Sequence, residues 1–218
     1  MDNYLKAVFL IAGAMLGWQI PVIAQKLALY KCSKKGKELP SNPHYTTIKL
    51  KLGLCVLNGA VWFLSGIYID NIWVAILMAI LFSVAVLTAI VDIRIRIVPN
   101  ELVLLMLVLG LAFQVAEFGI SGILTALLCM FGMIILFSAV AGFVGFDKVG
   151  AGDVKLAGTM GLVLGFPGVI AGLVIMSVVF VAFTLIGLLT KRLTLKTMVP
   201  FAPFMMTGLV LSLLYIVF

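Results

Sequence analysis

Long apolar runs, separated by short polar or glycine-containing segments, fill most of the chain and limit what it can fold into. Of the 218 residues, 64% are hydrophobic and only 11% are charged, whereas a soluble domain usually has about 25% charged residues. A helix needs about 20 mostly apolar residues to cross a bilayer, and several runs approach that length. The sequence therefore predicts an all-α, polytopic membrane protein in which residues 1–218 form one integral domain.

Turn and charge signals divide the chain into about eight expected spans. Residues 70–71 and 118–119 read as tight turns, and residues 165–168, Gly-Phe-Pro-Gly, read as a third turn. If this third turn were only a break within one helix, the C-terminus would change sides. The expected spans are residues 4–23, 50–69, 72–91, 99–117, 120–143, 153–164, 169–189 and 200–218.

The distribution of basic residues predicts the orientation. Fourteen of the fifteen Lys and Arg residues fall in or beside the connections after the odd-numbered spans, and Lys6 is the exception. Since cytoplasmic segments are enriched in Lys and Arg, both termini are expected outside. Residues 30–51 are expected to be a short, basic cytoplasmic loop. The enrichment of Lys and Arg in cytoplasmic connections explains the net charge of +7. We therefore expect no nucleic-acid partner. The first apolar run lacks a small-residue cleavage site and is expected to be retained.

Two of the eight acidic residues, Asp92 and Asp153, stand where an apolar run meets a basic or glycine-rich connection on that same side. A carboxylate at a bilayer boundary is costly to desolvate, which makes it a functional-site hypothesis. Two such acids can hydrolyse a peptide without a metal: the ionised acid activates water, and the protonated acid donates to the carbonyl oxygen. From the residues alone, helix capping or pairing with Lys155, Arg94 or Arg96 is an equal alternative.

The sequence has few of the histidine and cysteine residues that other kinds of catalytic site need. His44 is the single histidine, and the three cysteines are scattered without a CxxC pair. We therefore expect no metal site and no cofactor. Asp147 is a third acid near Asp153 and is interpreted as a loop residue beside Lys148.

Three stretches, in this order, resemble the type IV prepilin peptidases, which are membrane aspartic proteases of the GxGD type. One of them, residues 199–204, has Ala202 where that family usually has glycine. The stretches are Asp92 with Ile97-Val98-Pro99-Asn100, then Gly150-Ala151-Gly152-Asp153-Val154-Lys155-Leu156, and then Val199-Pro200-Phe201-Ala202-Pro203-Phe204.

The resemblance implies that Asp92 and Asp153 are the catalytic aspartates. It further implies that the protein removes the short leader of prepilin or pseudopilin precursors at the cytoplasmic surface of the cell membrane, in a pilus or secretion system. Its partners would then be these precursors and membrane lipids. A smaller role, in shaping the site or binding substrate, is expected for Gly150, Gly152, Lys155, Pro200 and Pro203.

One departure separates the chain from many members of that family. These members carry two CxxC zinc pairs and also N-methylate the new amino terminus, whereas the loop at residues 30–51 contains only Cys32. We therefore expect peptidase activity alone, with the bifunctional enzyme as the alternative. A transporter with proton-relay acids, a non-enzymatic assembly scaffold and a different GxGD protease also stay open. A presenilin-like protease would have Tyr before the first aspartate, where this chain has Val91.

Overall fold

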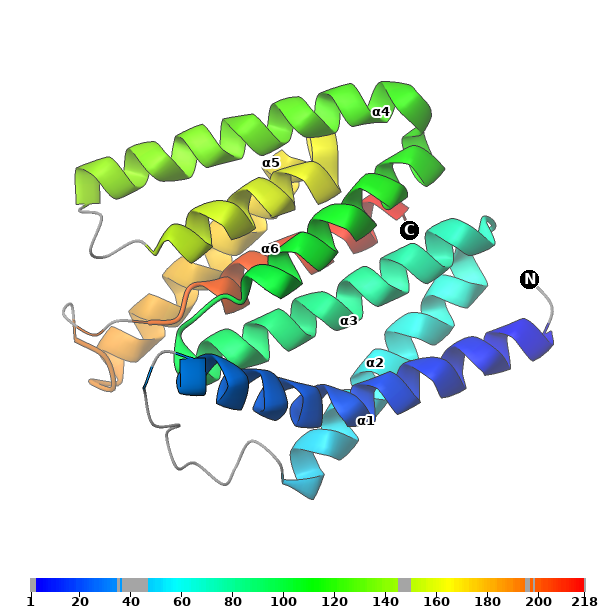
Figure 1. Ribbon diagram of the computed structural model, residues 1–218, viewed down its shortest axis with the longest axis horizontal. Coiled ribbons are helices and arrows are strands. Elements are labelled where there is room, and N and C mark those ends of the chain that lie inside the picture. The colour runs from blue at the N-terminus through cyan, green and yellow to red at the C-terminus, as the bar shows by residue number, and fades with distance from the viewer. Residues whose placement is uncertain are drawn as a thin grey trace.

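The chain folds into a bundle of long helices (Figure 1). The computed structural model describes residues 3–34, 36, 47–144, 150–194, 197 and 199–217. Within these ranges all of the regular secondary structure is helical. The helices are α1 (Asn3–Lys34), α2 (Ile48–Tyr68), α3 (Ile72–Ile95), α4 (Asn100–Val144), α5 (Ala151–Leu189) and α6 (Ala202–Val217).

Helices α4 and α5 each consist of two helical segments joined by a turn at which the chain reverses its direction (Figure 1). Gly119 in α4 has φ 70° and Gly165 in α5 has φ 58°, a left-handed conformation that glycine adopts without strain. The buried Gln114 side chain donates a 2.7 Å hydrogen bond to the Val163 carbonyl beside the second reversal. Both reversals fall at turns that the sequence predicts.

The helices identify a multi-pass membrane protein. By length and apolarity, α1 to α5 can each cross a membrane, and α6 is shorter. The two reversals separate the helices in the same order as the expected spans. The number of crossings and the side on which each terminus lies stay predictions.

Helix α1 is longer than the sequence predicts. Its expected end at residue 23 is wrong, because the helix continues through Pro21 to Lys34. The expected loop at residues 30–51 is therefore too long, since residues 30–34 belong to α1 and residues 48–51 belong to α2. Past the proline, the small residues Ala24, Ala28 and Cys32 recur every fourth position and are buried. This spacing places them on one helix face that packs inward, which offsets the backbone hydrogen bond that Pro21 removes. His44 lies outside the described residues.

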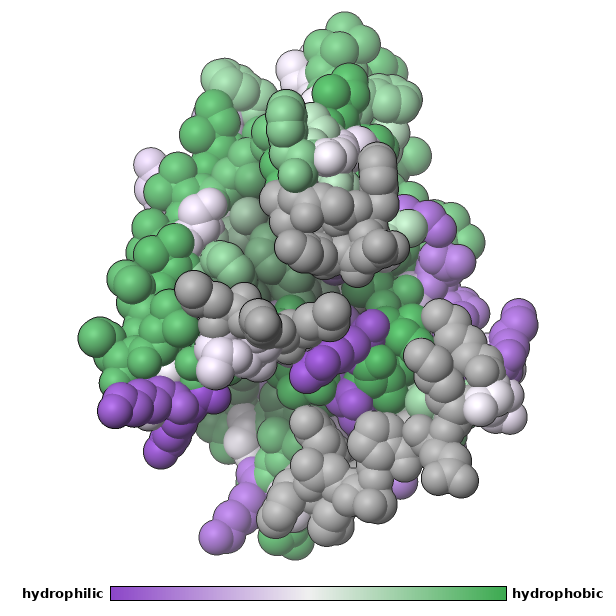
Figure 2. All heavy atoms as spheres, turned by 90° about the vertical axis from the view of Figure 1, so that its left-hand side faces the viewer, coloured by the Kyte–Doolittle hydropathy of each residue, from purple (hydrophilic) through white to green (hydrophobic). Residues whose placement is uncertain are grey.

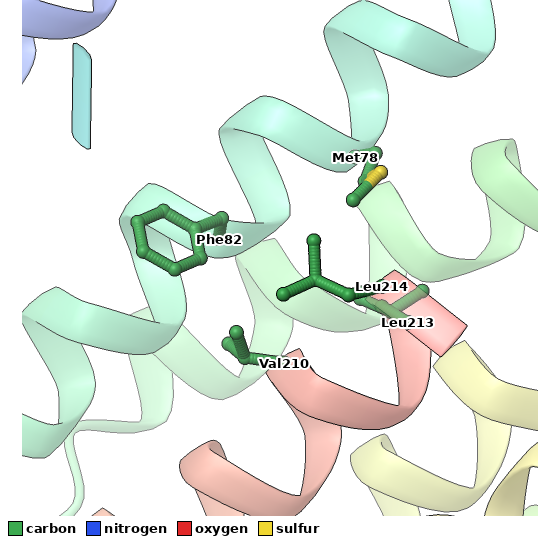
Figure 3. Close-up of a pocket in the computed structure, with 5 residues that line it drawn as sticks. All are labelled: Met78, Phe82, Val210, Leu213 and Leu214. Carbon is green, nitrogen blue, oxygen red and sulfur yellow. The ribbon is translucent and has the colours of Figure 1, made fainter. Parts of the chain in front are cut away.

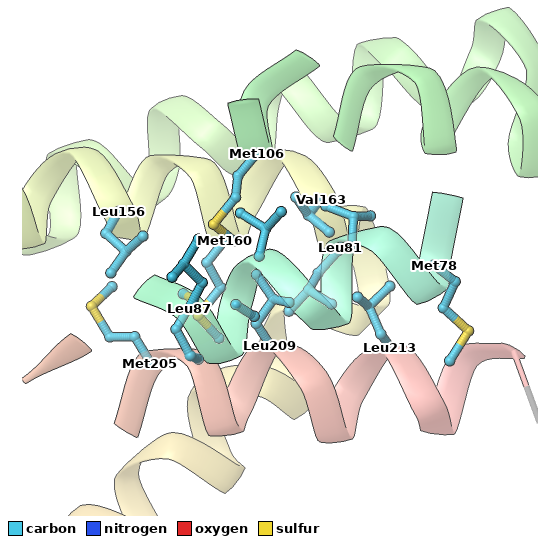
Figure 4. Packing of buried hydrophobic residues seen from close by; sticks show 14 of the residues in the cluster. Met78, Leu81, Leu87, Met106, Leu156, Met160, Val163, Met205, Leu209 and Leu213 are labelled. Atoms are coloured by element: carbon cyan, nitrogen blue, oxygen red, sulfur yellow. The ribbon is translucent and has the colours of Figure 1, made fainter. Parts of the chain in front are cut away.

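Helix α3 lies at the centre of the bundle and is the most buried of the long helices. Its side chains meet those of α4, α5 and α6 in a core rich in methionine (Figure 4). The flexible thioether fills irregular gaps between helices. Core residues include Met78, Leu81, Leu87, Met106, Leu156, Met160, Val163, Met205, Leu209 and Leu213.

Helices α3 and α6 are in direct contact far from the basic connections. The gap among Met78, Phe82, Val210, Leu213 and Leu214 has no room for a water molecule (Figure 3). Van der Waals packing of this kind holds membrane helices together. It therefore fixes where α6 lies along α3, including the position at which α6 begins.

Helices α1 and α2 approach closely at glycines. A Cβ atom on Gly13 would lie 2.5 Å from Cβ of Trp62, and Gly17 is one turn further along the same face. Small residues four positions apart are a common means of close helix packing in membranes. Asn58 donates a 2.7 Å hydrogen bond to the Gly13 carbonyl and accepts one of 2.9 Å from Ser83 on α3. This network joins α1, α2 and α3.

Candidate active site

Asp92 and Asp153 come from different helices and lie at the same end of the bundle. Asp92 is in the last turn of α3 and is 4% exposed, and Asp153 is half-buried in the first turn of α5. Gly152, next to Asp153, packs against Val98 in the connection that follows α3, so the two helix ends that carry the acids lie together. This end is at the left of Figure 1. Figure 2 views it directly and shows hydrophilic residues across it, with hydrophobic flanks.

The carboxylate of Asp92 is held by the start of α6. The main-chain N–H of Ala202 donates a 3.1 Å hydrogen bond to Oδ2 of Asp92, in a fully buried position. The first N–H groups of a helix have no partner inside the helix, and an anion at this end is also stabilised by the helix dipole. Asp92 therefore caps α6 from another helix.

Aromatic side chains fix the point at which α6 begins. Phe180 on α5 contacts the rings of Phe201 and Phe204 edge to face, with centroids 5.4 and 5.2 Å away. Pro203 lies in the first turn of α6, where its missing N–H is tolerated. Pro200 is half-buried in the extended segment before the helix. The Pro-Phe-Ala-Pro-Phe stretch thus places the Ala202 amide against Asp92.

The Asp153 side chain caps its own helix. Gly150 is the N-cap of α5, in an extended conformation, and its N–H donates a 3.2 Å hydrogen bond to Oδ2 of Asp153. The capping alternative is therefore correct as a description of this contact, and it engages one carboxylate oxygen. A carboxylate that accepts a main-chain hydrogen bond is held in one orientation.

Gly152 permits a close approach within the chain. A Cβ atom at this position would lie 3.1 Å from Cβ of Val98 in the connection between α3 and α4. Any side chain here would press on that connection, which follows Asp92 directly. Glycine at position 152 therefore brings the first turn of α5 close to the end of α3.

Two lysines hold the first turn of α4 at this end. Lys155 donates a 3.2 Å hydrogen bond to the Asn100 side chain, and within the described ranges it forms no ion pair with Asp153. Lys31 on α1 forms a 2.6 Å ion pair with Glu101.

The sequence predicts a short loop at residues 93–98, but α3 continues to Ile95 and buries Arg94. Asp147 lies outside the described residues.

Sequence reasoning missed two contributors to the site. The Ala202 amide is a main-chain group, and its role as a donor cannot be recognised from the type of amino acid at this position. Asn100 stands in a stretch that was recognised, but its bond to Lys155 joins positions 55 residues apart. In the part of the chain that the structure describes, no three His, Cys, Asp or Glu side chains gather into a group that would hold a metal ion.

The fold and the site define an all-helical, multi-pass membrane protein with two acids from different helices at one end of the bundle. The model of the type IV leader peptidase family matches residues 75–191, which is more than half of the chain and includes both acids. The chain therefore belongs to the type IV leader peptidase family, and the resemblance is confirmed. Membership implies a protease. Residues 199–204 lie beyond the matched range. No curated protein and no solved structure shows significant similarity to the chain.

Proposed function

We propose that the protein is an aspartic endopeptidase that removes the leader from prepilin-like or pseudopilin precursors, with Asp92 and Asp153 as its catalytic pair. The observation that carries the proposal is the placement of the two acids. They are 61 positions apart in the sequence, yet both stand in terminal turns of helices at one end of the bundle, where Gly152 contacts Val98. Two carboxylates in one site share a proton, because like charges held close cannot both ionise readily.

The pair supplies both halves of the hydrolytic step. The ionised carboxylate removes a proton from a water molecule, whose oxygen attacks the scissile carbonyl carbon. The protonated carboxyl group donates its proton to the carbonyl oxygen, which gives a neutral tetrahedral intermediate. When the intermediate collapses, the C–N bond breaks and the departing nitrogen receives a proton from the site. The main-chain bonds from Ala202 and Gly150 hold one oxygen of each acid during these steps.

The position of the site fits a bond next to a membrane-embedded helix. Leader peptides of the resembled family end directly before an apolar helix, so the scissile bond lies where that helix leaves the bilayer. Both acids lie in the terminal turn of a helix, at the same end of the bundle as Lys31, Arg96 and Lys155. Such basic residues are typical of cytoplasmic connections, which supports cleavage at the cytoplasmic surface of the cell membrane.

Peptidase activity alone is the form of the proposal that the sequence favours. The segment at residues 30–51 has one cysteine, Cys32, which lies in the last turn of α1. Two CxxC pairs are needed to build a four-cysteine zinc site. Methyl transfer to the new amino terminus is therefore not part of the proposed activity.

The test uses the purified protein in liposomes together with a pilin-like precursor and a methyl donor. Mass spectrometry of the products is expected to show cleavage at the junction of leader and apolar helix, with an unmodified amino terminus. An intact precursor would contradict the proposed peptidase. A methylated product would instead support the bifunctional enzyme.

A further inference from the structure

The first turn of α4 is tied to two other helices by neighbouring residues. Glu101 pairs with Lys31 at 2.6 Å, which joins α4 to α1. Asn100 accepts a 3.2 Å hydrogen bond from Lys155, which joins α4 to α5. The two bonds are alike in being made by a lysine at one end of the bundle. Only the second reaches the helix that carries Asp153.

Each partner of the second bond is covalently close to one acid. Lys155 is two residues after Asp153, and Asn100 follows Asp92 after the last turn of α3 and a short connection. Successive residues of an α-helix are rotated by about 100°, so Asp153 and Lys155 point to nearly opposite sides of α5. The lysine can therefore bind Asn100 without occupying the side of α5 on which Asp153 lies. Its influence on the acid passes through the helix backbone.

A second contact brings the same two segments together. The backbone of Gly152 lies against Val98, where an added Cβ would be 3.1 Å from the valine Cβ. This contact limits how closely α5 approaches the connection after α3. An apolar contact has no preferred direction, so by itself it does not orient the first turn of α5 on that connection. A directional hydrogen bond one turn further along supplies the missing restraint.

We propose that Lys155 and Asn100 are positioning residues, whose hydrogen bond fixes the first turn of α5 so that Asp153 meets Asp92 in the reactive geometry. This proposal rests on the proposed function of the two acids. It differs from pairing with Asp153, which the sequence offers as one role for Lys155, and it gives the expected site-shaping role a specific partner, Asn100.

Four single variants test the bond through activity. Lys155→Met and Asn100→Leu remove it, and kcat for precursor cleavage is expected to fall about tenfold with KM within about twofold, since small misplacement of catalytic groups lowers turnover. Lys155→Arg and Asn100→Asp keep a donor and an acceptor, and both are expected to retain most of the wild-type kcat. A rise in KM alone would overturn the proposal in favour of a substrate contact.

A double variant and a matched control complete the kinetic test. Residues that act through one bond are not additive, so Lys155→Met with Asn100→Leu is expected to be no slower than either single variant. Glu101→Gln, which removes the bond from the same turn to Lys31, is expected to stay within about twofold of wild-type kcat. Loss in Lys155→Met without loss in Asn100→Leu would overturn the proposal.

A distance measurement separates this proposal from the proposed function. Spin labels on the exposed residues Ala151 and Leu104 report the separation of α5 and α4 in liposomes, without any need for cleavage. The distance distribution is expected to broaden in Lys155→Met and Asn100→Leu, and to keep its wild-type width in Glu101→Gln. Unchanged distributions would overturn the positioning role even if the precursor is cleaved. A wild-type protein that cuts no precursor would instead count against the peptidase proposal.

Discussion

The main-chain N–H of Ala202 donates a 3.1 Å hydrogen bond to Oδ2 of Asp92, 110 positions earlier in the chain. This bond joins the third recognised stretch, at residues 199–204, to the first. Helix α6 begins at Ala202 because the rings of Phe201 and Phe204 pack on Phe180. The proline and phenylalanine residues of this stretch therefore position the N–H group that binds Asp92, although none of their side chains is an acid or a base.

The first prediction concerns the donor to Asp92. Ala202→Pro removes this N–H group at the start of a helix, where proline is otherwise tolerated. A hydrogen bond to a charged group contributes roughly 1.5–3 kcal/mol, so kcat/KM for precursor cleavage is expected to fall about tenfold to a hundredfold. The measurement is steady-state cleavage in liposomes.

Ala202→Gly is the matched control for that variant. It keeps the N–H group and only removes a methyl group, and glycine is the residue that the resembled family usually has here. Its activity is expected to stay within a few-fold of wild type. Equal losses in the glycine and proline variants would show that the effect comes from packing rather than from the hydrogen bond.

The second prediction concerns the space beside Gly152. Gly152→Val places methyl groups against Val98, since even a Cβ atom would lie 3.1 Å from the valine Cβ. The first turn of α5 must then move away from the end of α3, and kcat is expected to fall by about tenfold or more. Gly152→Ala needs a shift of only a few tenths of an ångström and is expected to lose less.

Gly132→Val provides the comparison for this prediction. A Cβ atom at Gly132 in α4 would meet no atom within 4 Å. The same substitution is therefore expected to leave cleavage unchanged. A Gly152→Val variant as active as Gly132→Val would contradict the inference that the close approach at residue 152 positions Asp153.

The third prediction concerns the stability of the α1–α2 pair. A Cβ atom on Gly17 would lie 2.8 Å from Cα of Cys55, and main-chain atoms cannot turn aside as a flexible side chain can. Gly17→Val is expected to lower the free energy of unfolding by about 1–3 kcal/mol, as overpacking does. Thermal unfolding in detergent measures the change. Gly53→Val, on the open face of α2, is expected to cause a smaller loss, and equal losses would contradict the close-packing account.

The sequence predicted the helical class and the two chain reversals because these depend on local signals. The apolar runs are long, and Gly119 and Gly165 adopt the positive φ that glycine favours in turns. The length of α1 was not predicted, because Pro21 and the lysines after it resemble the end of a helix. The burial of Ala24 and Ala28, which lets the helix continue, depends on tertiary packing.

The same contrast between local sequence signals and tertiary packing applies to the candidate site. Asp92 and Asp153 could be singled out as candidates because carboxyl groups are rare in this chain and these two stand at the ends of apolar runs. The bond from Ala202 and the bond between Lys155 and Asn100 join residues 110 and 55 positions apart. Contacts at such separations depend on how the helices pack. By contrast, the four-residue spacing of Gly13 and Gly17 is a local packing signal that could have predicted the close contact of α1 with α2.

The most direct test of the account compares four proteins in precursor cleavage: wild type, Asp92→Asn, Asp153→Asn and the double variant. Asparagine keeps the size of each side chain but cannot carry the shared proton. Each single variant is expected to lose about a thousandfold or more in kcat, and the double variant to lose little further, because residues that act as one unit are not additive. Asp70→Asn, at the exposed turn before α3, is the control and is expected to cleave normally. Normal cleavage by a single variant of Asp92 or Asp153 would contradict the assignment of that acid.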